Sequence, residues 1–265
     1  MVKTFEHQIY FDRFLRLNPT RFTHPKVFLE KVPEIVKERI LPRREKLKVV
    51  GGHFAFGIHK TVDEPYDYVT VVRNPIERVI SEYYYMKQKG FYYQELILKE
   101  DLSLEEYLHH PETRYLNNLQ TRLISGVPYE NGDEVNDEIY DLALKNLKEM
   151  MVVGISERFS ESLALFSLVM NWKRIPIHTK ANRNDERPKI NAIDSYTIKR
   201  IEEREQYDLA LYKEAIQIFE NQLEAHQEGV DQIINKISYP SLLRTTSKEV
   251  LQKGYQIKRK ILSIF

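Results

Sequence analysis

The chain has 265 residues, enough for one large domain with a terminal extension. Its 40 basic and 39 acidic residues leave a net charge of +1, so composition gives no general attraction to nucleic acid. The absence of cysteine excludes disulfides, thiolate nucleophiles and cysteine-ligated metals. No apolar run is long enough to span a membrane and no signal-peptide pattern is present, which predicts a cytoplasmic protein.

The first 47 residues are predicted to be helical. Phe5 to Leu17 forms one helix, and Pro25 to Leu47 forms a second that is interrupted at Pro33 and Pro42. This second helix is rich in lysine, arginine and glutamate.

The next segment, residues 49–61, contains glycines that superficially match a nucleotide-binding loop. Gly52 and Gly57 have the Walker spacing, but Lys60-Thr61 follows two residues too late, so the pattern argues against a P-loop nucleoside triphosphatase. His53 stands at a predicted strand end, where an imidazole that titrates near neutrality can act as a general base. A buried, hydrogen-bonded histidine explains the same position. His59 is predicted to be structural.

Residues 66–87 predict a strand that runs directly into a capped helix. The β-branched run 68–72 is typical of a strand buried on both faces. Asn74 is the expected N-cap, Pro75 suits the first helical position, and Glu77 completes a capping box. A strand end followed by a helix N-terminus favours an anion beside Arg73. An ordinary βα unit with Arg73 in an ion pair remains the alternative.

The pattern R-N-P-x-E-R-x-x-S-x-Y-Y-Y in this segment resembles the 3′-phosphate-binding segment of carbohydrate sulfotransferases. The similar group contains heparan sulfate 2-O-sulfotransferase and its bacterial relatives. The resemblance implies that Arg73 and Ser81 hold the 3′-phosphate of the sulfate donor PAPS (3′-phosphoadenosine 5′-phosphosulfate). The G-H-F-x-F-G run is similar to the family's G-H segment and implies that His53 is the general base. The reaction requires no metal.

The N-terminus departs from this family. Its members begin with a strand and a P-K-T-G-G-T-T-like loop that cradles the 5′-phosphosulfate, whereas this chain begins Met-Val-Lys-Thr-Phe-Glu. Lys3 is the only residue there that is expected to replace the loop lysine. Either the strand and loop are lost or the true start lies upstream, and the departure leaves catalytic activity open.

Residues 88–150 are predicted to be helical and rich in loops. Ser103 to Glu106 forms a capping box. The segment 118–126 resembles a family segment near the acceptor cleft, so Gln120 or Arg122 is expected to contact an anionic sugar, although an exposed helix face explains both equally well. Residues 136–150 predict an amphipathic helix, with these residues facing inward: Ile139, Leu142, Leu144 and Leu147.

The remaining elements continue the alternation of strands and helices. Residues 151–155 predict a second buried parallel strand, and V-G-I-S-E-R-F-x-E-S-L there resembles a scaffold segment of the family. A short strand is expected at 173–177. The polar loop 178–188 resembles the family's basic loop that closes over PAPS, which implies Lys180 and Arg183 as donor contacts; a solvated charged loop is the alternative. Two helices follow from Asp194.

Together these features predict a helix-rich α/β fold, a P-loop-like three-layer sandwich with a mostly parallel central sheet. A sulfotransferase-like domain is expected over residues 1–228, with the resemblance spanning about 48–225, followed by a basic helical tail at 229–265. The tail suits a weak membrane-surface or partner contact, a helix packed on the domain, or a frayed end.

The expected function is PAPS-dependent transfer of a sulfuryl group to a hydroxyl, with a carbohydrate as acceptor. The alternative is an inactive sulfotransferase-like protein that binds a nucleotide or a partner. No metal and no nucleic-acid partner are expected, and the sequence leaves the acceptor and the oligomeric state open.

Overall fold

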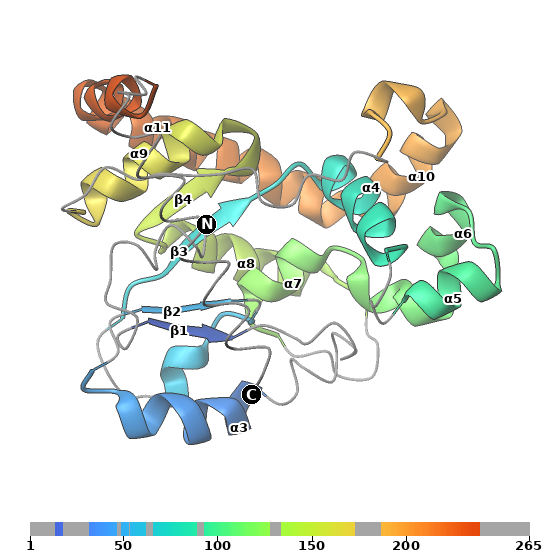
Figure 1. Cartoon of the computed structure of the whole chain (residues 1–265), viewed down its shortest axis with the longest axis horizontal. Helices are drawn as coiled ribbons and strands as arrows, with labels where there is room; N and C mark the ends of the chain where they lie inside the picture. Colours follow the sequence, from blue (N-terminus) through green and yellow to red (C-terminus); the bar gives the residue numbers. More distant parts are fainter. Residues whose placement is uncertain are drawn as a thin grey trace, which may run out of the picture.

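The computed structural model describes residues 14–17, 32–46, 49–52, 54–61, 66–88, 93–127, 134–172 and 187–238. These residues form a helix-rich α/β fold with a small amount of parallel sheet, as expected (Figure 1). Strand β1 (Phe14–Leu17) pairs with β2 (Val49–Gly52), and β3 (Val69–Val72) pairs with β4 (Val152–Ile155), both in parallel. No helix among these residues is both long and apolar enough to cross a membrane.

Strand β1 corrects the prediction of a helix over Phe5–Leu17. Residues 14–17 are extended, and Phe14 lies opposite Val49 in the parallel ladder with β2. A short apolar run is compatible with either a strand or a helix, and here a distant strand decides between them by supplying hydrogen bonds. The helix predicted over 25–47 is seen from Val32 to Arg43, as consecutive α3 (Val32–Ile35), η2 (Val36–Ile40) and η3 (Leu41–Arg43).

Strand β4 lies at the centre of the main core, and all four of its residues are buried, as the sequence predicts. Helices α9 (Phe159–Val169) and α11 (Gln206–Ser238) both contact it. At Gly154 the backbone of β4 comes so close to α9 that an added Cβ would lie 3.0 Å from Ser162 Cβ and from the Phe166 ring. Glycine is therefore required for this close packing of helix on strand.

Strand β3 differs from the expectation of burial on both faces, because only Val72 is fully buried and the other three residues are half-buried. The apolar composition of the run is compatible with either environment. The buried end of β3 is the end that leads into α4 (Pro75–Met86). The strand is therefore most firmly enclosed where the candidate site begins.

Helix α8 (Asp137–Lys148) forms as predicted but is rotated relative to the expected inward face. Ala143, Asn146 and Leu147 are buried, whereas Leu142 is 39% exposed and was wrongly expected inside. Asn146 is buried because its Nδ2 donates to the carbonyls of Ile124 and Ser125, at 2.9 and 3.0 Å. These carbonyls end α7 (Leu119–Ser125), so a polar residue on α8 anchors the two helices together.

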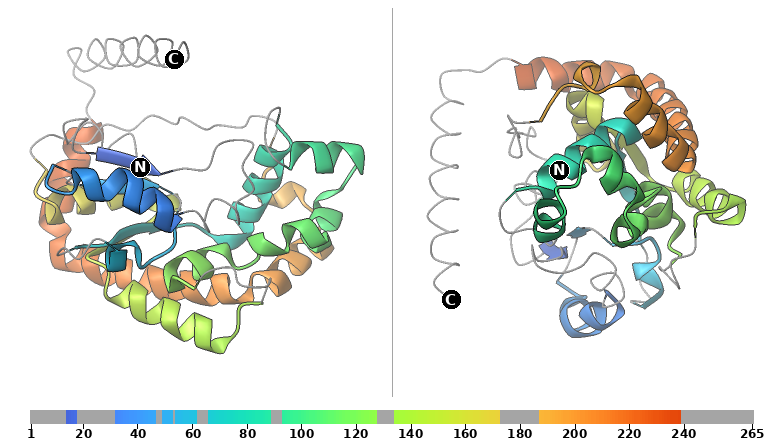
Figure 2. Two further views of the ribbon diagram at one scale, coloured as in Figure 1. Left: turned by 90° about the horizontal axis from the view of Figure 1, so that it is seen from below. Right: turned by 90° about the vertical axis from the view of Figure 1, so that its right-hand side faces the viewer.

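A second, entirely helical cluster lies beyond the end of β3 (Figures 1 and 2). It is built from α4, α5 (Gln94–Lys99), α6 (Leu104–His109), η5 (Pro111–Leu116) and α10 (Ser195–Arg204). The predicted capping box at Ser103 and Glu106 is confirmed. The largest buried side chains of the cluster are Tyr93 and Tyr107.

Helices α10 and α11 confirm the two helices predicted after Asp194. Figure 1 shows α11 extending from α10 along the molecule to α9. Val230 is buried in the main core, so the packed part of α11 continues past residue 228. The predicted strand at 173–177 and the tail after Ser238 lie outside the described residues.

Candidate anion-binding site

The turn between β3 and α4 forms largely as its sequence predicts. Asn74 is the N-cap, and its Oδ1 accepts the N–H of Glu77 at 3.1 Å, while Pro75 begins the helix. The predicted capping box is wrong in one respect, because the N–H of Asn74 donates to Glu157 Oε1 at 3.0 Å, and not to Glu77. Glu157 lies in η6 (Ser156–Arg158), directly after β4. The carboxylate of Glu77 is thereby left for other contacts.

Gln120, in the first turn of α7, fixes the backbone of Arg73. Its Oε1 accepts the N–H of Arg73 at 2.8 Å and its Nε2 donates to the Arg73 carbonyl at 2.9 Å. The amide thus satisfies both backbone groups at the point where β3 ends and no ladder partner continues. Gln120 was expected to contact a sugar, but in this structure its side chain holds the arginine in place.

Asp208 of α11 accepts hydrogen bonds from the first turn of α7, which carries Gln120. Its Oδ2 accepts the N–H of Gln120 at 3.1 Å, and its Oδ1 accepts both the N–H and the hydroxyl of Thr121 at 2.7 and 2.8 Å. The side chain of Asp208 is fully buried. A buried carboxylate with several donors is rigidly placed, so the start of α7 is held firmly against α11.

The side chain of Arg73 is 33% exposed and lies 3.7 Å (Nη2 to Oε2) from Glu77. Arg187 pairs with the same oxygen of Glu77 from a separate part of the chain. Burial lowers the pKa of Arg73, and the charge of Arg78 lowers that pKa further, whereas Glu157 raises it. Burial and the charge of Arg73 likewise lower the pKa of Arg187. Two guanidinium groups therefore converge on one carboxylate.

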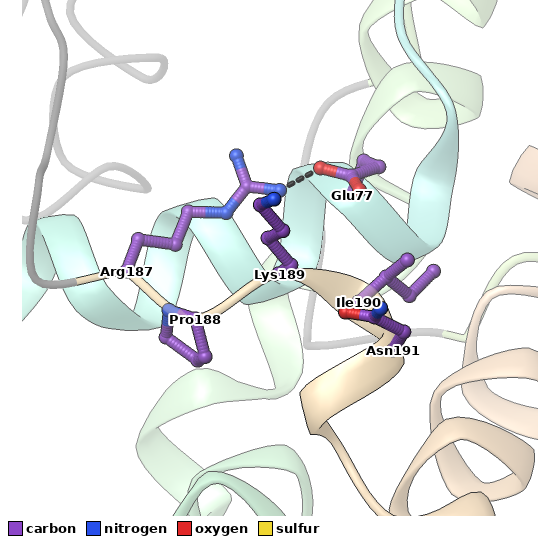
Figure 3. Close-up of a pocket in the computed structure, with 6 residues that line it drawn as sticks. All are labelled: Glu77, Arg187, Pro188, Lys189, Ile190 and Asn191. Carbon is purple, nitrogen blue, oxygen red and sulfur yellow. Dashed lines mark ion pairs between the residues drawn. The ribbon is translucent and has the colours of Figure 1, made fainter.

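A cavity of about 560 Å³ opens at this pair (Figure 3). It is lined by Glu77 of α4 and by the segment Arg187, Pro188, Lys189, Ile190 and Asn191. Figure 3 shows the side chains of Arg187 and Lys189 extending towards Glu77, while Ile190 and Asn191 point away from it. Cationic groups from one segment thus face the first turn of α4, where the positive end of the helix dipole also favours an anion.

The structure brings only part of the expected site together. Ser81 is half-buried and lies one turn beyond Glu77 on the same side of α4, so it borders the group around Arg73. Arg122 is 6% exposed and its Nε donates to the carbonyl of Asn117 at 3.1 Å, which excludes the alternative of an exposed helix face for this residue. Four further predicted residues lie outside the described residues: Lys3, His53, Lys180 and Arg183.

The segment that follows His53 is nevertheless tied to the same short helix. The N–H of Phe56 donates to the Leu123 carbonyl at 2.7 Å. Gly126 ends α7 with a φ of +76°, and an added Cβ there would lie 2.5 Å from the carbonyl oxygen of Phe56. Helix α7 therefore holds Arg73 at its first turn and Phe56 at its last.

Next to this site, α4 carries a second, buried arginine. Arg78 pairs with Glu82 at 2.8 Å, with Glu205 at 2.7 Å and with Asp208 at 3.6 Å. Burial by itself would lower the pKa of Arg78, but the adjacent carboxylates, chiefly Glu205, more than offset this and raise it. Nε of Arg78 has no hydrogen-bond partner among the described residues, but the guanidinium is buried among these three carboxylates and is a structural group.

Sequence reasoning missed Arg187, Lys189 and Glu157. Arg187 and Lys189 flank Pro188, which restricts the backbone just before the 3-10 turn η7 (Ile190–Ala192). The charge pattern R-P-K was therefore a usable signal within the polar loop. Nothing local marks Glu157, since its partner Asn74 is 83 residues away.

Comparison with known proteins adds no family to this geometry: no family model matches the chain, and no curated protein matches it. Among the described residues there is also no cluster of three or more histidine, aspartate or glutamate side chains arranged to hold a metal.

Proposed function

We propose that this protein transfers a sulfuryl group from PAPS to a hydroxyl, with a carbohydrate as the acceptor. The proposed architecture is a P-loop-like three-layer sandwich around a mostly parallel sheet. The observation that supports the proposal most directly is Arg73, which Gln120 holds by two backbone hydrogen bonds at the carboxyl end of β3. In open α/β folds, ligands bind at the carboxyl ends of parallel strands.

The arrangement suits a phosphate monoester at the start of α4. A guanidinium fork matches phosphate oxygens, and the N-terminus of α4 contributes a positive dipole end. Ser81 supplies a hydroxyl one turn after Glu77 on α4, and Arg187 supplies a second guanidinium beside that of Arg73. In this proposal the group held here is the 3′-phosphate of PAPS.

The chemistry of transfer is assigned to residues that the resemblance identifies. His53 accepts the proton of the acceptor hydroxyl as its oxygen attacks sulfur, and the bond from sulfur to the bridging phosphate oxygen breaks. Negative charge develops on that oxygen, so a nearby cation must stabilise it. Lys180 or Arg183 would close the site over the donor.

The cation beside the leaving phosphate was assigned to Lys3. This lysine precedes β1, whereas the family's loop is expected to follow the first strand. The first cation that follows β1 in the sequence is Arg21. Replacing Lys3 and Arg21 separately by alanine therefore identifies which of them contributes to turnover.

The test of the site is calorimetric titration with adenosine 3′,5′-bisphosphate. Saturable binding is expected, and Arg73→Ala should weaken it by roughly 10–100-fold, the value of a charge-assisted hydrogen bond to phosphate. Arg39→Ala, which removes an exposed arginine on η2, is the matched control and should leave affinity unchanged. Absence of binding by the wild-type protein would overturn the proposal.

A second candidate is a protein that binds the nucleotide but does not transfer sulfate. The sequence favours it at one point, because no P-K-T-G-G-T-T-like loop is present. Incubation with PAPS and a panel of sugars separates the two functions. Turnover that His53→Ala abolishes while bisphosphate binding survives supports the enzyme, and tight binding without turnover supports the binding protein.

A further inference from the structure

Glu77 occupies the place between Arg73 and Arg187 that a bound anion would take. The same carboxylate oxygen, Oε2, pairs with Arg187 and lies 3.7 Å from Nη2 of Arg73. The side chain of Glu77 is 28% exposed and lines the cavity shown in Figure 3. An acidic side chain thus stands inside a group of cations at the start of α4.

This carboxylate is not needed to cap the helix. In a capping box the third helical residue would accept the N–H of the N-cap, but Glu157 accepts the N–H of Asn74 instead. Asn74 Oδ1 in turn accepts the backbone N–H of Glu77, a contact that does not depend on the Glu77 side chain. The carboxylate can therefore leave its position without uncapping α4.

The surrounding cations exceed what one carboxylate can satisfy. Nε of Arg187 is buried and has no hydrogen-bond partner among the described residues. Lys189 extends into the same space, so Arg187 and Lys189 both face the carboxylate of Glu77, and Nη2 of Arg73 lies 3.7 Å from Oε2 of that carboxylate. A buried donor without an acceptor is costly, and a ligand with several oxygens would satisfy it better than Glu77 does.

We propose that Glu77 is an internal anion that holds the site in the empty protein and must be displaced when the ligand's phosphate binds. This inference rests on the proposed function, because it concerns the same phosphate position. Displacement subtracts one fixed free energy from the binding of every anion at this position. Weakly held ions therefore fail to occupy the site, whereas a nucleotide, which adds contacts through its base and ribose, still binds.

The test compares wild-type protein with Glu77→Gln, using inorganic phosphate and adenosine 3′,5′-bisphosphate as separate probes in calorimetry. Glutamine keeps the length and the backbone cap but removes the competing charge. We expect both probes to bind roughly fivefold more tightly to the variant, a value in keeping with a partly exposed ion pair. Glu95→Gln, which removes a carboxylate paired with Lys99 on the exposed face of α5, is the control and should change neither affinity.

The size of the two gains distinguishes displacement from simple repulsion. If Glu77 stayed in place and only repelled the ligand, the more highly charged bisphosphate would gain more than inorganic phosphate, and this outcome would overturn the inference. Unchanged or weaker binding to Glu77→Gln would also overturn it.

The two proposals fail in different ways. Suppose that phosphate binds more tightly to Glu77→Gln, while the bisphosphate binds no better than phosphate. This result would support Glu77 as an internal anion and contradict the proposed nucleotide site. If the bisphosphate binds the wild-type protein and Glu77→Gln tightly and with equal affinity, the nucleotide site is supported and the role of Glu77 as an internal anion is contradicted.

Discussion

Arg73 and Arg78 lie at the start of the same helix, yet their surroundings are opposite. The side chain of Arg73 is 33% exposed and Glu77 is its nearest carboxylate, at 3.7 Å. Arg78 is 11% exposed and pairs with Glu82, Glu205 and Asp208. The backbone of Arg73 is fixed by Gln120, while its guanidinium has only one carboxylate within 4 Å among the described residues. The guanidinium of Arg78 instead contacts three carboxylates in the interior.

The difference also concerns which charge is in excess. Around Arg73, the guanidinium groups of Arg73 and Arg187 share the carboxylate of Glu77, and we propose that an anion from outside completes the region. Around Arg78, carboxylates are in excess, and burial raises the pKa of Glu205 to about 7 even though Arg78 opposes this. Burial thus favours the protonated form of Glu205 in the buried region, whereas the proposal for the exposed region is that it binds an anionic ligand.

The largest effect on stability is expected from Arg78→Ala. Removing this cation leaves buried carboxylates without their partner, which costs about 3–5 kcal/mol for a buried pair that is broken on one side. Urea unfolding followed by circular dichroism measures the change. Arg114→Ala, at an exposed position on η5, should leave the unfolding midpoint unchanged. Equal unfolding midpoints for Arg78→Ala and Arg114→Ala would show that Arg78 does not stabilise the buried region.

The next effect is a pH dependence that belongs to Glu205. Its pKa is raised from 4.5 to about 7 in the folded protein, so folding favours the protonated form. The stability that this group contributes is fully present below about pH 4.5 and is lost as the pH rises through about 7.

Glu205→Gln tests this directly, because glutamine is neutral at every pH. Across this window the wild-type protein should lose up to about 3 kcal/mol of unfolding free energy relative to the variant. Urea unfolding at a series of pH values measures the difference between the two proteins. A difference that does not change with pH would show that Glu205 is ionised throughout.

Gln120→Ala should have an intermediate effect that links the two regions. It removes both hydrogen bonds to the Arg73 backbone and should cost about 1–2 kcal/mol of stability, together with weaker binding of adenosine 3′,5′-bisphosphate. Gln120→Glu should not restore either property, since a carboxylate cannot donate to the Arg73 carbonyl and would lie close to Asp208.

The control for this pair is Gln227→Ala on the exposed side of α11, where the glutamine bonds only to Asp231 among described residues. It should alter neither stability nor binding. If Gln120→Ala bound the bisphosphate as well as the wild-type protein does, the backbone clamp would have no role in the site.

The smallest effect on stability is expected from Arg73→Ala. Its partly exposed pair with Glu77 contributes less than about 1 kcal/mol, so the unfolding free energy should hardly change while ligand affinity falls. This profile is the reverse of that for Arg78→Ala. Destabilisation of Arg73→Ala as large as that of Arg78→Ala would mean that both arginines are structural.

Features that depend on near neighbours could be predicted from the amino-acid sequence. The helix from Pro75, its cap at Asn74 and the capping box at Ser103 were all predicted, because each requires only contacts within one turn of the chain. The buried strand β4 was also predicted, since a continuous apolar run has few other uses in an α/β protein.

The partners of long-range polar groups could not be predicted, because they depend on how the whole chain packs. Residues 14–17 form a strand because they pair with β2. The N–H of Asn74 donates to Glu157 and not to Glu77. The side chain of Gln120 bonds the backbone of Arg73, which is 47 residues away. The inward face of α8 was likewise set by the carbonyls that Asn146 bonds at the end of α7. A hydrogen-bonding side chain can satisfy itself in many ways, and packing of the whole chain selects one of them.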